Sequence, residues 1–243
     1  MKKIDLNIDI GEGFGLENDI IPLIKSCNIS CGSHAGNDME IKKCIALATK
    51  YKVKIGAHPS YPDKENFGRV SMKIDRKELA ANLEYQLTHF IKFLNHPDDL
   101  NHVKPHGALY NDCLKNEILV DTFLKVILKC CPNTTIFTMY KSELWKQAKK
   151  KGISVWCEAF LDRVYTKDGK LQDRGEVGAV ISDVNKIFMQ LESMINKKKV
   201  KTNEGKWISI KADTYCLHGD HPNVIKNLQK LIELCNNKIT YEL

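Results

Sequence analysis

The chain has 243 residues, of which 43% are hydrophobic, so it is long enough and apolar enough to bury a sizeable core without disulfides or metals as staples. This composition excludes a collagen, an intrinsically disordered chain and a mini-protein scaffold. The 37 basic and 30 acidic side chains give a net charge of +7, but only four of the basic residues are arginines, so we expect no nucleic-acid partner.

Short segments rich in β-branched residues alternate along the chain with longer segments of helical period. Seven of them are predicted strands: residues 4–9, 27–31, 53–57, 102–104, 135–139, 154–159 and 214–217. Apolar stripes of helical spacing occupy residues 79–94, 184–195 and 224–232. The lysine run 149–151 stands before Gly152, and such a pattern is typical of a helix end.

This alternation predicts an α/β fold with a parallel sheet and right-handed crossovers. Seven repeats in 243 residues favour a closed (β/α) barrel, and an open doubly wound sheet is the alternative. No linker or shift of composition divides the chain, so we expect one domain over residues 1–243. Hairpin-like excursions are expected at residues 164–172 and 200–212, and the long loop 160–178 favours a lid or binding loop.

Polar side chains follow the predicted strands where a parallel barrel brings its loops together. The residues in this position are Asp9, Glu12, His34, His58, Lys104, Glu158 and, a few residues further on, His106, Asp162, Arg163, His218 and Asp220. Asp213 comes just before the last strand, so its place at this rim is left open. The four histidines of this set each stand next to a glycine or proline turn, which indicates a shared site.

Histidines together with carboxylates are typical of either a metal site or acid/base catalysis. The sequence has no H-E-x-x-H motif and no Cys/His spacing of a zinc site. Asp9, His34 and His58 on three consecutive strands would form an Asp-His-His set for a divalent metal with positions open to water. Otherwise the histidines are general acids and bases. Both interpretations stay open at this point.

A glycine-rich segment, residues 11–15, follows the first strand. It is not a dinucleotide fingerprint because Leu16 stands where the last glycine is needed, and no G-x-x-x-x-G-K-[ST] loop occurs. The segment either presents N–H groups to an anion or forms a tight turn that brings Glu12 over the barrel mouth. Any use of ATP must depend on another kind of site or on another chain.

The nine cysteines form no C-x-x-C pair, and their number is odd. Cys27, Cys31 and Cys216 lie in predicted strands, where a small buried hydrophobe explains them better than a nucleophile. Acidic residues interrupt the N-terminal segment, so we expect no secretory leader and a reduced, cytoplasmic protein. No uncharged apolar stretch approaches the about 18 residues that span a bilayer, so we expect no membrane segment.

Several blocks of the sequence resemble the LamB/YcsF family. They are residues 7–13 (NIDIGEG), 32–36 (GSHAG), 56–59 (GAHP), 103–111 (VKPHGALYN), 162–163 (DR), 212–214 (ADT) and 216–220 (CLHGD). The chain departs from the family pattern at four positions. The family usually has Phe where this chain has Ser33 and Asp where it has Asn37. It often has Gly in place of Ser60, and it has Arg in place of Lys211. The segment between Gly15 and Asp19 also looks shorter than the corresponding segment of the family. Asn37 lacks the family's carboxylate, so no catalytic role is carried to it.

The resemblance implies a seven-stranded barrel related to the glycoside hydrolase and deacetylase superfamily. It also implies hydrolytic opening of the lactam 5-oxo-L-proline to L-glutamate, with ATP as cosubstrate and 5-oxoprolinase subunits B and C as partners. The residues expected to be catalytic are Asp9, Glu12, His58, Lys104, His106, Asp213 and His218. Those expected to bind substrate are His34, Arg163 and Asp220.

Two other functions compete with this one. The first is a stand-alone metal-dependent hydrolase that removes N-acyl groups from an amide or a carbohydrate. The second is a non-catalytic subunit that only holds a small lactam or sugar. The number of titratable groups argues against simple binding, which needs few ionisable side chains in one pocket.

Overall fold

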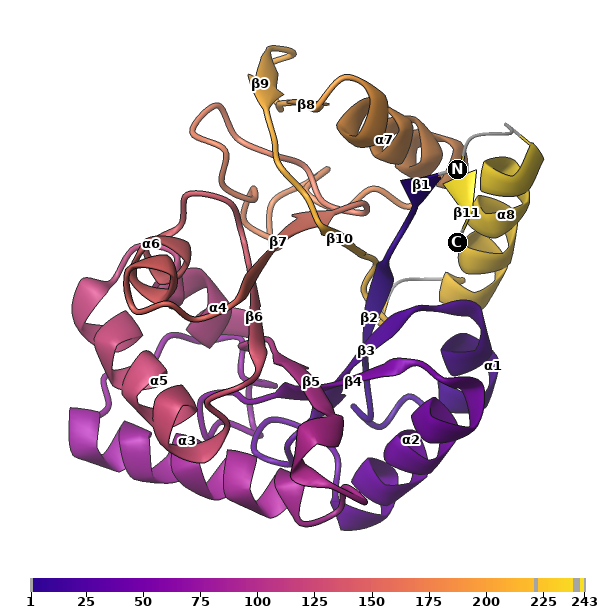
Figure 1. The fold of residues 1–243 in the computed structure, drawn as a ribbon. Coiled ribbons are helices and arrows are strands. Elements are labelled where there is room, and N and C mark those ends of the chain that lie inside the picture. Colours follow the sequence, from indigo (N-terminus) through magenta and orange to yellow (C-terminus); the bar gives the residue numbers. More distant parts are fainter. Residues whose placement is uncertain (1, 221–222, 238–240, 243) are drawn as a thin grey trace.

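We describe the chain from a computed structural model over residues 2–220, 223–237 and 241–242. Parallel strands close into a barrel in the order β10-β2-β3-β4-β5-β6-β7 (Figure 1). Their bounds are β2 Leu6–Ile10, β3 Ser26–Ser30, β4 Lys54–His58, β5 Leu100–Val103, β6 Thr135–Thr138, β7 Val155–Phe160 and β10 Thr214–Cys216. Each overlaps one predicted strand. The closed barrel is confirmed, and the open doubly wound sheet is wrong.

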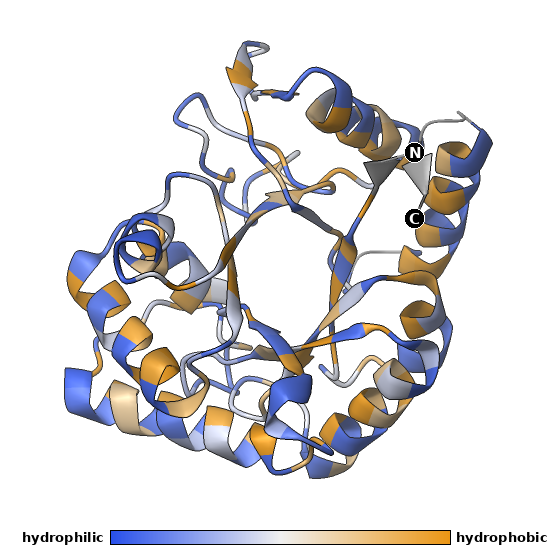
Figure 2. Cartoon of the chain, in the orientation of Figure 1, coloured by the Kyte–Doolittle hydropathy of each residue, from blue (hydrophilic) through white to orange (hydrophobic). Residues whose placement is uncertain are grey.

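Helices surround the barrel and turn apolar residues toward it (Figure 2). They are α1 Glu17–Ile20, α2 Asp38–Tyr51, α3 Arg76–Ile91, α4 Gly107–Cys113, α5 Glu117–Cys130, α6 Glu143–Lys150, α7 Val184–Asn196 and α8 Val224–Asn237, with 3₁₀ turns η1 Ile21–Leu23 and η2 Pro97–Asp99. The three predicted apolar stripes lie in α3, α7 and α8. Asp75 and Asp183 cap the starts of α3 and α7, because their side chains accept N–H bonds from the first turns of these helices. The predicted helix end at Gly152 is confirmed by α6.

The two excursions predicted at residues 164–172 and 200–212 both leave the barrel, and only the second contains paired strands. Strands β8 (Lys199–Lys201) and β9 (Trp207–Ser209) make an antiparallel hairpin, and the earlier excursion is closed by a single antiparallel bridge between Tyr165 and Leu171. Strands β1 (Lys2–Lys3) and β11 (Tyr241–Glu242) pair in parallel and bring the two chain ends together (Figure 1). Among the described residues, no helix is long and apolar enough to cross a membrane.

Polar side chains fill part of the barrel interior and bond to one another. Asn7 Nδ2 donates to Thr214 Oγ1 at 2.8 Å, and Asn28 Nδ2 donates to Asn7 Oδ1 and to Asp9 Oδ1, both at 2.8 Å. His102 Nε2 lies 2.8 Å from Asn28 Oδ1. Buried polar groups are stable only when paired, so this network fixes Asp9 at the carboxyl end of β2.

We expect Gly56→Ala to destabilise the barrel by about 2 to 3 kcal/mol, because a methyl group there would overlap the imidazole of His102. Moving that ring would also break its bond to Asn28. Urea denaturation measures the loss. The control is Gly175→Ala, whose new methyl group would lie 3.4 Å from Asp173 Oδ1 and needs no rearrangement. Equal denaturation midpoints for the two variants would contradict the close packing described here.

Candidate active site

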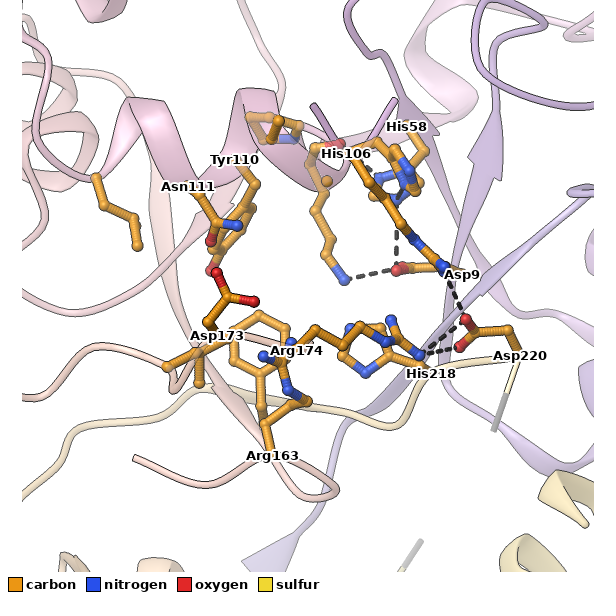
Figure 3. Close-up of a pocket in the computed structure, with 18 of the residues that line it drawn as sticks. Asp9, His58, His106, Tyr110, Asn111, Arg163, Asp173, Arg174, His218 and Asp220 are labelled. Atoms are coloured by element: carbon orange, nitrogen blue, oxygen red, sulfur yellow. Dashed lines mark hydrogen bonds and ion pairs between the residues drawn. The ribbon is translucent and has the colours of Figure 1, made fainter. Parts of the chain in front are cut away.

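A pocket of about 400 Å³ opens at the carboxyl ends of the barrel strands (Figure 3). Eight of the predicted site residues line it: Asp9, Glu12, His58, Lys104, His106, Arg163, His218 and Asp220. His34 lies directly behind the lining, buried, with its ring stacked on His106 at a centroid distance of 3.6 Å. The polar residues that follow five different strands therefore do gather at one rim.

A buried ion-pair group forms the floor of the pocket. Lys104 Nζ lies 2.8 Å from Asp9 Oδ1 and 2.9 Å from Glu158 Oε1. Burial acts to lower the pKa of Lys104, but Asp9, Cys216 and Glu158 outweigh it and hold that pKa well above its usual value. Burial likewise acts to raise the pKa of Asp9, and His58 and Lys104 hold it well below the usual value. Asp9 is therefore a carboxylate and Lys104 an ammonium at neutral pH.

Three imidazoles form one wall of the site. His58 Nδ1 lies 2.7 Å from the carbonyl oxygen of Lys104, and His106 Nε2 lies 2.9 Å from that of Phe67. Because a carbonyl oxygen only accepts, these two ring nitrogens carry hydrogens. Burial lowers the pKa of His34 to about 2. Burial, together with His34 and His58, also holds the pKa of His106 well below its usual value, so both rings are neutral.

Glu12 reaches the same cluster from the glycine-rich turn. Its Oε1 lies 3.1 Å from His34 Nε2 and 3.3 Å from His106 Nδ1. Burial, with repulsion from Asp9, raises the pKa of Glu12 to about 7. The glycines at positions 11, 13 and 15 have φ of 69°, 87° and 73°, which only glycine adopts easily. The segment is thus a tight turn that brings Glu12 back over the barrel mouth, as one of the two interpretations predicted.

His218 follows β10, lies close to Asp9 and is oriented by Asp162. The Nδ1 atom of His218 lies 3.0 Å from both carboxylate oxygens of Asp162, and its backbone N–H donates to one of them at 3.1 Å. Asp162 is fully buried. A carboxylate so placed keeps the hydrogen on Nδ1 and leaves Nε2 as the nitrogen available for proton transfer.

The pocket also gathers three of the four arginines of the chain, Arg69, Arg163 and Arg174. Arg69 Nη2 lies 2.5 Å from Asp220 Oδ2, and Arg174 Nη2 lies 2.6 Å from Asp220 Oδ1. Arg69 and Arg174 were not among the site residues predicted from the sequence. The available signal was the scarcity of arginine, since a planar guanidinium is preferred where carboxylate or phosphate must be bound. The long loop contributes Arg174 and residues 170–173 to the lining, in keeping with a binding loop.

Two glycines next to the site histidines permit close approach of neighbouring loops. A Cβ atom on Gly107 would overlap the carbonyl oxygen of Gly68, and one on Gly219 would overlap the carbonyl oxygen of Asp9. The turns predicted beside His106 and His218 are therefore present. Their physical reason is close contact between loops and, at Gly107, whose φ is 51°, backbone freedom as well.

The structure corrects the predicted metal-ligand set. Asp9, His34 and His58 do not bring their donor atoms to one point. Within the described residues, three sets place a donor atom of every member within 4.8 Å of the others: Asp9 with His58 and His106, Glu12 with His34 and His106, and Asp9 with Cys216 and His218. His106 is absent from the predicted set because its strand, β5, is not one of the three consecutive strands considered.

Asp213 lies outside the pocket, contrary to its predicted catalytic role. It is exposed at the amino end of β10, and its Oδ2 accepts the N–H bond of Cys157 at 2.8 Å. Residues that precede a barrel strand lie at the rim opposite the loops that carry chemistry. The position of Asp213 before the last strand was thus the sequence feature that indicated its place outside the pocket.

We expect Asp213→Asn to leave turnover within about twofold of the parent chain, because the amide oxygen still accepts from Cys157 and the pocket is untouched. Steady-state rates with the physiological substrate measure this. A loss of turnover as large as that of a pocket variant, in a folded Asp213→Asn chain, would restore Asp213 to the site.

Comparison with known proteins gives concordant matches over the whole chain. The LamB/YcsF family model matches residues 4–241. A 5-oxoprolinase subunit of Haemophilus influenzae (strain PittEE) is 36% identical over 234 residues, 96% of either chain. The corresponding 5-oxoprolinase subunit of Pyrococcus abyssi is 37% identical over 240 residues, 95% of this chain and 94% of the relative. The crystal structure of a lactam utilization protein from Thermus thermophilus superimposes with a TM-score of 0.87 at 31% identity, covering 100% of this chain and 99% of that one.

Proposed function

Since the chain belongs to the LamB/YcsF family, we propose that it is one component of an ATP-dependent 5-oxoprolinase that opens 5-oxo-L-proline to L-glutamate. The observation that carries the proposal is the single pocket rim where carboxylates and imidazoles face three arginines. The names of the relatives support a lactam substrate and an enzyme of several subunits. We propose subunits B and C as its partners and the cytoplasm, where ATP is available, as its location.

The chemistry explains why ATP is needed. A five-membered lactam is a resonance-stabilised amide, and water is a poor nucleophile for it. Transfer of the terminal phosphoryl group of ATP to the lactam oxygen would give ADP and an activated carbon. Water would then add to that carbon, and the carbon–nitrogen bond would break to leave a γ-glutamyl phosphate. A second water would hydrolyse this acyl phosphate to phosphate and glutamate. The chain has no Walker-type loop, so we assign ATP binding and phosphoryl transfer to the partner subunits and completion of the hydrolysis to this barrel.

The cations of the pocket suit an anionic substrate. 5-Oxoproline carries a carboxylate, and its activated form carries a phosphoryl group as well. Arg163 and Arg174 can bind such groups bidentately, and the ammonium of Lys104 stays charged because Asp9 and Glu158 pair with it. A volume of about 400 Å³ accommodates a small ligand of this kind.

Proton transfers are assigned to two different groups of the pocket. Glu12, which lies in one cluster with His34 and His106 and has its pKa raised to about 7, is the group placed to take the proton of the attacking water. His218, oriented by Asp162, is the group placed to protonate the departing nitrogen. His34 supports Glu12 from behind the lining, and Asp220 positions Arg69 and Arg174.

The direct test reconstitutes the chain with separately purified subunits B and C and follows glutamate release from 5-oxoproline. We expect turnover only with all three subunits and ATP. Turnover of an amide or N-acyl sugar by the chain alone, without ATP, would instead support the stand-alone metal-dependent hydrolase. Lactam binding without turnover in the full mixture would support a non-catalytic subunit.

A further inference from the structure

The imidazoles of His58 and His106 face each other with the ring nitrogens that do not bond to a carbonyl. The other ring nitrogen of each donates to a backbone carbonyl, at 2.7 Å for His58 and 2.9 Å for His106. His58 Nε2 and His106 Nδ1 lie 3.0 Å apart. When each ring carries only the hydrogen that its carbonyl accepts, both of these atoms present lone pairs to each other.

Two carboxyl groups lie beside this pair. Asp9 Oδ2 lies 3.4 Å from His58 Nε2, and Glu12 Oε1 lies 3.3 Å from His106 Nδ1. The side chains of all four residues are at most 8% exposed, so water does not screen them. The two ring nitrogens and Asp9 Oδ2 thus converge on one buried point, an arrangement that suits a bound cation.

We propose that Asp9, His58 and His106 bind one divalent transition-metal ion through Oδ2, Nε2 and Nδ1. Donor bonds of about 2.1 Å place neighbouring donor atoms about 3.0 Å apart in an octahedron and about 3.4 Å apart in a tetrahedron. The separations of 3.0 Å between the imidazole nitrogens and 3.4 Å between His58 and Asp9 fall within this range of donor–donor distances.

The surroundings of the three donors are those of a metal site. Each imidazole is held by a carbonyl at its second nitrogen, as metal-binding histidines usually are. The other oxygen of Asp9 is held by Lys104 and Asn28, which leaves Oδ2 for the ion. Two nitrogens and one oxygen favour Zn²⁺, Fe²⁺, Co²⁺ or Ni²⁺ over Mg²⁺ and Ca²⁺. All three residues line the pocket, so further positions of the ion open toward the substrate.

The test uses the isolated full chain, stripped with a chelator, reloaded with Zn²⁺, Co²⁺ or Mg²⁺ and desalted. We expect about one Zn²⁺ or Co²⁺ per chain by elemental analysis, and about a tenth as much Mg²⁺ or less. Zn²⁺ at about 100 times its Kd should raise the melting temperature by about 5 to 10 °C. In the Co²⁺ form, two strongly shifted exchangeable proton resonances should report the ring N–H groups of His58 and His106.

Variants identify the ligands. His58→Asn and His106→Asn should each weaken Zn²⁺ binding by at least about tenfold, whereas His89→Asn, which replaces a histidine on the outer helix α3, should bind as the parent does. The resonances of the Co²⁺ form need no variant, so they decide the matter if a variant fails to fold. Zn²⁺ and Co²⁺ contents below about 0.1 per chain would overturn the site and leave a shared proton between the imidazoles. No lactam, ATP or partner is used, so failure of the proposed 5-oxoprolinase activity leaves this result standing.

Discussion

Asp9→Asn should lower 5-oxoproline turnover in the reconstituted complex by about 1,000-fold, while the chain stays folded. Asp9 contacts Lys104 and His58 at the pocket floor, and its carboxylate is the nearest negative charge to both. The amide keeps the shape of the side chain but neither accepts a proton nor neutralises the ammonium. Measurement of kcat and KM for glutamate release, with circular dichroism as a check of folding, gives the result.

The matched control is Asp5→Asn, because Asp5 is a second buried aspartate of the same barrel. Asp5 accepts hydrogen bonds from Ser26, Thr214 and Lys54 and lies outside the pocket. Its replacement should lower stability and leave kcat within about threefold of the parent. If the two variants lose turnover equally, Asp9 acts through the integrity of the barrel and not through the chemistry.

The barrel was predictable because its determinants are local. Buried strands read as short β-branched runs, and each of the seven is bounded by a glycine, proline or polar turn, so their number and order followed from the sequence. Once the barrel was assumed, the rule that loops meet at the carboxyl ends placed His58, His106 and His218 together. The same rule places Asp213 at the opposite end of the barrel, so applying it strictly would have left Asp213 out of the predicted catalytic residues.

The partners of the site residues were not predictable, because they depend on loops without regular structure. Phe67 and Arg69 belong to a connection between β4 and α3 that no periodic pattern describes, yet Phe67 supplies the carbonyl that fixes the tautomer of His106. Arg174 meets Asp220 across 46 residues of sequence. Which of three neighbouring histidines brings a ring nitrogen close to Asp9 likewise depends on side-chain rotamers, and His106 does so together with His58 where the sequence-based set had His34.

Lys104→Met should destabilise the chain by about 3 to 5 kcal/mol, the usual cost of leaving buried charges without their partner. The ammonium of Lys104 is the shared cation of Asp9 and Glu158, and all three side chains are at most 8% exposed. Methionine fills the volume but leaves two carboxylates facing one another. Denaturation in urea at neutral pH measures the loss, and adding Glu158→Gln should recover part of it because one of the unpaired charges is removed.

Lys54→Met is the matched control, because it separates the effect of burial on the stability of an ion pair from the effect of the distance between its charges. Lys54 Nζ lies 2.8 Å from Asp5 Oδ2, the same separation as between Lys104 and Asp9, but the Lys54 side chain is 38% exposed. Water screens that pair and solvates its remaining partner, so the expected cost is about 1 kcal/mol or less. Equal losses of stability in Lys104→Met and Lys54→Met would mean that water reaches the pocket floor more than the packing indicates. Lys104 would then be free to exchange its carboxylate partners for the phosphoryl group of a substrate, and its pairing with Asp9 would no longer be a fixed feature of the site.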